Sequence, residues 1–101
     1  MFEKHEKEVQ YVKTVSAQLK LSLFQITDSK TNKQVEQLYD YIHSSPTKSS
    51  SSVSGIEQNI IDELKYLLNA ISLNDNLMAA QSANKILEMA KERNQKLHLL
   101  N

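Results

Sequence analysis

The stretch that decides the fold is residues 56–97, which reads IEQNIIDELKYLLNAISLNDNLMAAQSANKILEMAKERNQKL. Apolar side chains recur three and four residues apart in its first half, at Ile56, Ile60, Ile61, Leu64, Leu67, Leu68 and Ile71. The second half repeats this spacing at Leu77, Ala80, Ala83, Ile86, Leu87 and Ala90. Each half therefore forms one apolar stripe on a helix. Residues 72–76 interrupt the pattern with side chains that can cap a new helix. Two helices joined by so short a turn fold back on each other, so the stretch predicts an antiparallel hairpin.

Two further apolar stripes precede this hairpin. The first covers residues 3–26, with heptad spacing at Val9, Val12, Ser16, Leu19, Leu23 and Ile26. The second covers residues 32–43 and opens on Thr31 and Gln34, which have the spacing of a capping box. Ser54 and Glu57 form another capping box at the start of the third helix. The sequence therefore predicts an all-α fold, an antiparallel bundle of four helices near residues 3–26, 32–43, 56–72 and 75–97.

Composition narrows the functional classes. The 101 residues are enough for one domain, and twelve basic side chains balance twelve acidic ones. A protein that binds nucleic acid normally has a basic excess, so no nucleic-acid partner is expected. The chain has no cysteine, and no apolar run approaches eighteen residues. These features favour a cytoplasmic location without direct membrane insertion.

A serine-rich segment separates the second predicted helix from the third. Residues 44–55 contain seven serines together with the chain's single Pro and single Gly. This composition is typical of a flexible loop inside the single domain, residues 1–101. The loop is expected to be dispensable for folding, because closure entropy changes slowly with loop length. A simple tether is one interpretation, and phosphorylation at Ser45, which precedes Pro46, is the other.

The residue types that carry catalysis or bind cofactors do not form a pattern. Three histidines are far apart in the sequence, at His5, His43 and His98, and lack the spacing of a metal site. One glycine cannot build a phosphate-binding loop. The serines lie in a segment without a paired base. The sequence therefore predicts no catalytic, cofactor-binding or metal-binding residues, and a protein that is not an enzyme.

Three tyrosines are the candidate contact residues. Tyr11, Tyr41 and Tyr66 lie beside the apolar stripes of their predicted helices. An amphipathic ring at such a position either covers the edge of the core or contacts a partner protein. The sequence alone leaves both interpretations open, and it leaves the oligomeric state open as well.

Two blocks of the sequence resemble a known family. Residues 33–42, KQVEQLYDYI, are similar to the "KR-x-x-x-L-F-D-x-L" helix in the carboxy-terminal domain of the outer-coat rod subunit of the COPII coat. The steroid receptor RNA activator protein shares that domain. Residues 68–80, LNAISLNDNLMAA, resemble the family's "A-L-x-x-x-(D/N)-(F/Y)-x-x-A" turn between two helices.

The resemblance implies a non-catalytic helical protein–protein interaction or scaffold domain of the vesicle-coat type. It also implies coat subunits as partners and endoplasmic reticulum exit sites as the place of action. The residues support an alternative function as well. In that alternative the chain is a helical subunit of a larger tethering, syntaxin-like or transcription assembly, and residues 3–26 are donated to a partner as a coiled-coil strand.

Overall fold

Helices account for most of the computed structural model, which describes residues 2–48 and 50–100, with side chains described from Tyr11 onward. The helices are α1 (Phe2–Leu23), α2 (Ser29–His43), α3 (Ser54–Ser72) and α4 (Asn76–Leu100). No strand occurs in the described ranges. The predicted all-α fold of four helices is therefore confirmed. The observed boundaries differ from the predicted ones by at most three residues at each helix end.

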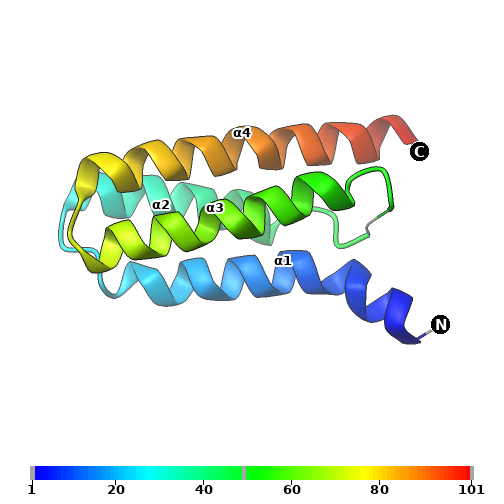
Figure 1. Cartoon of the computed structure of the whole chain (residues 1–101), viewed down its shortest axis with the longest axis horizontal. Coiled ribbons are helices and arrows are strands. Elements are labelled where there is room, and N and C mark those ends of the chain that lie inside the picture. The colour runs from blue at the N-terminus through cyan, green and yellow to red at the C-terminus, as the bar shows by residue number, and fades with distance from the viewer. Residues whose placement is uncertain (1, 49, 101) are drawn as a thin grey trace.

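The helices lie side by side along the long axis of the molecule, and the chain reverses at each connection (Figure 1). α1 packs on α2 and α3, and α4 packs on the same two helices. The consecutive helices α2 and α3 therefore occupy opposite corners of the bundle. Their connection crosses one end, while the two shorter connections lie at the other end (Figure 1).

The core consists of the apolar stripes of all four helices. Its large side chains are almost fully buried, among them Val15, Leu19, Val35, Leu38, Ile42, Ile60, Leu67 and Ile86. Burying one such side chain contributes about 1.5–3 kcal/mol, so these stripes dominate the stability of the fold. Small buried side chains on α4 let neighbouring helices approach it closely, at Ala79, Ala83 and Ala90. Among the described residues, no helix is long and apolar enough to cross a membrane.

The start of α2 differs from the predicted capping box. The N-cap residue is Asp28, whose carboxylate accepts hydrogen bonds from the Thr31 amide at 2.9 Å and the Thr31 hydroxyl at 2.7 Å. These bonds hold the pKa of Asp28 below its ordinary value, so the cap is intact at neutral pH and is lost as the pH falls through that lowered pKa. Gln34 does not cap, because its amide donates to the Ala80 carbonyl of α4. The prediction that Thr31 and Gln34 cap this helix is wrong.

The start of α3 also differs from the prediction. Ser54 is the first helical residue, and its hydroxyl donates to the Ser51 carbonyl at 3.0 Å. The N-cap residue is Val53, which is fully buried and provides no side-chain cap. Glu57 does not complete a capping box, because its carboxylate accepts a hydrogen bond from Arg93 of α4. The predicted Ser54–Glu57 capping box is therefore wrong.

Arg93 is the most deeply buried charged side chain among the described residues, with 0% of its surface exposed. Its Nε lies 2.9 Å from Glu57 Oε2. Nη1 donates to the Pro46 carbonyl at 2.7 Å, and Nη2 donates to the Lys48 carbonyl at 3.0 Å. The guanidinium also lies over the Tyr11 ring of α1, 4.6 Å from its centroid, which is a cation–π contact. One side chain of α4 thus binds α1, α3 and the serine-rich loop together.

A second set of hydrogen bonds extends this cluster to α2. Arg93 Nη1 donates to Asn94 Oδ1 at 3.0 Å, and Asn94 Nδ2 donates to the Ser45 hydroxyl at 2.8 Å. Ser45 in turn donates to the Tyr41 carbonyl at 2.7 Å, in the last turn of α2.

Burial raises the pKa of the Tyr11 phenol well above its ordinary value, although Arg93 opposes the shift. The phenol therefore stays neutral beneath the guanidinium.

The packing of the loop changes the expectation drawn from its composition. Ser45 and Val53 are buried at its two ends, and the carbonyls of Pro46 and Lys48 accept hydrogen bonds from a buried cation. One residue of the predicted loop, Ser49, lies outside the residues that the structure describes. A folded protein loses stability when a buried guanidinium loses its hydrogen-bond acceptors. We therefore expect the loop to contribute to the stability of the folded state, contrary to the expectation from its composition.

Replacing the buried cation tests this cluster. Arg93→Ala should lower the free energy of unfolding by about 3–5 kcal/mol, because it removes a buried cation together with its ion pair to Glu57 and its hydrogen bonds to the loop carbonyls. Urea denaturation measures the change. Lys96→Ala is the matched control on the same helix, since Lys96 and Glu92 form an exposed pair worth less than about 0.5 kcal/mol. Equal losses in the two variants would contradict the structural role of Arg93.

Shortening the loop tests its contribution to folding. Deleting residues 48–52 should lower the Tm by more than about 10 °C. In a domain of this size, a loss of 1 kcal/mol in the free energy of unfolding lowers the Tm by about 4–8 °C. The deletion removes the Lys48 carbonyl and shortens a connection between opposite corners of the bundle. Differential scanning calorimetry measures the shift. A full-length control with Ala at the exposed Ser51 and Ser52 should keep the wild-type Tm, and an unchanged Tm in the deletion would refute the prediction.

Candidate interaction surface

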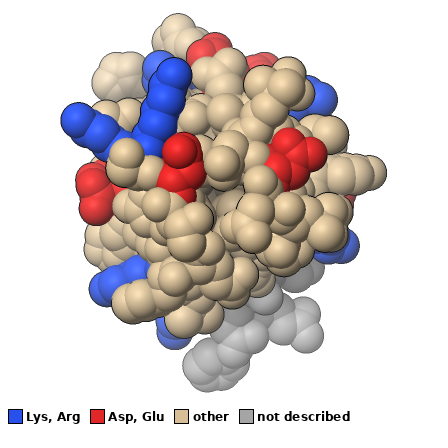
Figure 2. All heavy atoms as spheres, turned by 90° about the vertical axis from the view of Figure 1, so that its left-hand side faces the viewer, with Lys and Arg blue, Asp and Glu red and all other residues tan. Residues whose placement is uncertain are grey.

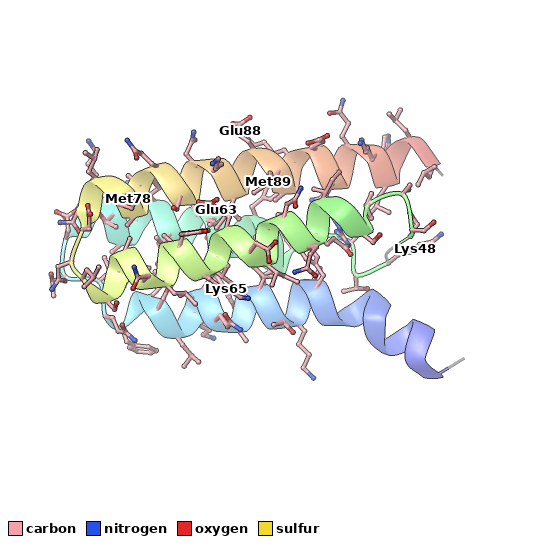
Figure 3. All side chains as sticks on the ribbon, viewed as in Figure 1. Lys48, Glu63, Lys65, Met78, Glu88 and Met89 are labelled. Atoms are coloured by element: carbon pink, nitrogen blue, oxygen red, sulfur yellow. The ribbon has the colours of Figure 1, made fainter. Side chains whose placement is uncertain are left out.

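Large apolar side chains are exposed at the end of the bundle opposite the serine-rich loop. Phe24 is 85% exposed, Leu73 69%, Leu77 73% and Met78 49%. These four residues are called the apolar end below. They lie where α1 and α3 finish and α4 begins, and Figure 3 shows Met78 far from Lys48 of the loop. Figure 2 looks onto this end, where uncharged atoms cover most of the face, acidic side chains lie on the face itself, and Lys and Arg lie mostly toward the edges.

The α3–α4 turn fixes two of these residues. Asn74 adopts a left-handed conformation with φ of 56°. The Asp75 amide donates to the Ala70 carbonyl and the Asn74 amide donates to the Ile71 carbonyl, which is the Schellman pattern of a helix end. Asp75 is also the cap of α4, because its carboxylate accepts from the Met78 amide at 3.0 Å. Asn74 and Asp75 thus make the turn, and Leu73 and Leu77 flank it facing solvent.

The α1–α2 connection holds Phe24 in a defined position. Its amide donates to the Leu21 carbonyl at 3.3 Å, and the next two residues continue the same type of turn. The Asn32 side chain of α2 donates to the Leu23 carbonyl at 3.1 Å and so satisfies the end of α1. The Phe24 ring is therefore exposed from an ordered, hydrogen-bonded backbone.

The three tyrosines predicted as contact residues have different environments. Tyr11 is only 3% exposed and lies beneath Arg93, so its assignment as a partner contact is wrong. Tyr41 is half-buried against the core, which is the core-edge environment. Tyr66 is 65% exposed on α3, where it lines a shallow, open depression with Asp62, Lys65 and Asn69. The structure does not bring the three tyrosines together, and none of them belongs to the apolar end.

Ser45, the predicted phosphorylation site, is buried. Its hydroxyl donates to the Tyr41 carbonyl and accepts from Asn94, so both of its hydrogen-bonding roles are filled inside the protein. A kinase reaches this hydroxyl only after the loop opens. Phosphorylation of Ser45 stays a prediction, with loop opening as its physical requirement.

Candidate metal ligands and histidines were compared among the side chains that the structure describes. No group of three or more His, Cys, Asp or Glu able to hold a metal occurs among the described residues. His43 stacks on Tyr39 at 5.2 Å, His98 is exposed on α4, and the His5 side chain lies outside the described residues. The ionic cluster around Arg93 is buried, and its guanidinium is hydrogen-bonded to the loop. Its contacts join elements of the bundle.

Sequence reasoning missed both the apolar end and Arg93. Arg93 belongs to the apolar seam of α4, because it follows Ala90 by three residues and precedes Leu97 by four. A basic residue on an apolar seam is the feature of the sequence that could have indicated a buried ion pair. Leu73 and Leu77 flank the predicted turn, where side chains are normally polar. No family model matches the chain, and no curated protein or solved structure matches it.

The turn that positions Leu73 and Leu77 can be tested at Asn74. Asn74→Val should lower the free energy of unfolding by about 1–2 kcal/mol, because a β-branched residue is strained at positive φ. Asn74→Gly should be neutral or stabilising by up to about 1 kcal/mol. Chemical denaturation measures both. Asn84→Val, at an exposed helical position of α4, should change stability by less than about 0.5 kcal/mol. A Val variant at residue 74 as stable as this control would exclude the left-handed turn.

Proposed function

We propose that the chain is a non-catalytic helical protein–protein interaction domain whose contact surface is the apolar end. The exposure of Phe24, Leu73 and Leu77, each more than two-thirds exposed, is the observation that carries this proposal. Large apolar side chains that are exposed together at one end of a folded protein are typical of interaction sites.

The apolar end is not needed for the fold, which strengthens the proposal. Asn74 and Asp75 supply the hydrogen bonds of the α3–α4 turn, and polar side chains at positions 73 and 77 would leave those bonds in place. Exposed Leu and Phe reduce solubility and add nothing to the core. Departures from the usual surface pattern concentrate at functional sites.

A narrower proposal assigns the domain to the COPII type of vesicle coat, acting in endoplasmic reticulum export. It rests on the resemblance of residues 33–42 and 68–80 to the coat family's motifs. The first block lies within α2, and the second contains the α3–α4 turn together with Leu73 and Leu77. In this proposal the partners are other coat subunits, and the domain works in the cytoplasm at endoplasmic reticulum exit sites.

The rival function, donation of the first helix to a partner as a coiled-coil strand, requires a free seam on α1. Val12, Val15 and Leu19 of that seam are at most 5% exposed, because they pack inside their own chain. Donation would first have to extract these side chains from the core. We therefore favour the self-contained interaction domain.

An affinity experiment tests the proposal and its narrower form. The immobilised chain should retain coat subunits from a cell lysate, identified by mass spectrometry. A variant carrying Phe24→Gln and Leu77→Gln should lose them, because it removes apolar contact area while leaving the core intact. The matched control carries Leu99→Gln and Leu100→Gln, which are exposed at the opposite end of α4.

The outcomes separate the two levels of the proposal. Consistent absence of coat subunits from the wild-type eluate would reject the coat assignment. Retention of coat subunits that survives the Phe24 and Leu77 substitutions would place the contact elsewhere and reject the apolar end as the binding surface.

A further inference from the structure

We propose that the apolar end binds a second copy of this chain, end to end, through a two-fold symmetric contact. The inference rests on the proposed function, because it names the partner of the same surface. In a two-fold contact each exposed side chain meets the same patch on the other copy, so apolar area meets apolar area.

The size of the apolar end fits a weak dimer. Taking about 200 Å² for a fully exposed large side chain, its four residues present on the order of 500 Å² of apolar surface. Two such ends pressed together bury on the order of 1,000 Å², which is the lower limit for a specific interface. The bundle measures 41 × 25 × 20 Å, so its narrow end cannot offer a much larger contact. We therefore expect reversible association, not an obligate dimer.

The net charge of the chain does not oppose the contact between copies. The chain carries twelve basic and twelve acidic side chains, so two copies have no net repulsion. Two carboxylates belong to the connections at this end, those of Asp28 and Asp75. Both accept backbone amide hydrogen bonds at the start of a helix, where the helix dipole stabilises negative charge. Because apolar area drives the contact, association should persist at high salt.

Sedimentation equilibrium tests the proposal directly. The wild-type chain should show a monomer–dimer equilibrium between about 10 µM and about 1 mM, the range expected of so small an interface. Leu77→Lys should weaken dimerisation at least tenfold, since a two-fold contact contains the substitution twice. Leu99→Lys, at the far end of α4, should leave the equilibrium unchanged. Both positions are exposed, so both variants should keep the wild-type circular dichroism spectrum.

Disulfide trapping gives a second, geometric test. The chain has no cysteine, so a single introduced thiol reports only its own surroundings. Among single Cys substitutions at Phe24, Leu73, Leu77 and Met78, the position nearest the two-fold axis should form a disulfide-linked dimer under mild oxidation, because only there do two copies of one position come close together. Leu99→Cys should remain monomeric under the same conditions.

The results distinguish this inference from the proposed function. A chain that stays monomeric up to about 1 mM would overturn dimerisation, whereas retention of coat subunits that depends on Phe24 and Leu77 would still support the interaction domain. Dimerisation lost in Leu99→Lys but kept in Leu77→Lys would also overturn the proposal, because it places the contact at the opposite end. Dimers that dissociate in 1 M NaCl would exclude apolar contact as the driving force.

Discussion

The organisation of one end of the bundle depends on the interactions of the buried Arg93 guanidinium. A charge without solvent must be neutralised and hydrogen-bonded, and no single neighbouring helix supplies all the acceptors. Glu57 supplies the negative charge, and two loop carbonyls supply the remaining acceptors. The serine-rich segment is thus held across the bundle by the carbonyls of Pro46 and Lys48, and at its two ends by the Ser45 hydroxyl and the buried Val53 side chain. The part played by the two carbonyls belongs to the backbone, so the side-chain composition of the segment gives no indication of it.

The connections at the two ends of the bundle are held by different kinds of hydrogen bond. The long connection joins helices at opposite corners and is fixed by the hydrogen bonds of a buried ionic cluster. The short connections join neighbouring helices, and local hydrogen bonds satisfy their helix ends. Those local bonds leave Phe24, Leu73 and Leu77 without a structural role, so they can serve recognition. This separation of stability from the exposed apolar surface supports an interaction domain.

The capping residues show where local pattern reasoning fails. Thr31 and Gln34 have the right spacing for a capping box, but Asp28 caps the helix one turn earlier with a carboxylate that binds both the amide and the hydroxyl of Thr31. Glu57 also has capping-box spacing, yet a buried cation competes for its carboxylate more strongly than a backbone amide does. In both places a stronger charged partner decided the outcome, and in the second that partner is distant in sequence.

The sequence by itself determined the number of helices, their order and their approximate limits, because apolar spacing and helix breakers act within a few residues. It also indicated the tight α3–α4 turn, whose hydrogen bonds join residues at most five apart. Only the tertiary structure decided that Tyr11 is buried, that Arg93 binds the loop, and that Phe24 lies at the same end as Leu73. Arg93 and Glu57 are 36 residues apart, and only the packing of α3 on α4 makes them partners. Burial of a charge depends on which helices meet, and this depends on the whole bundle.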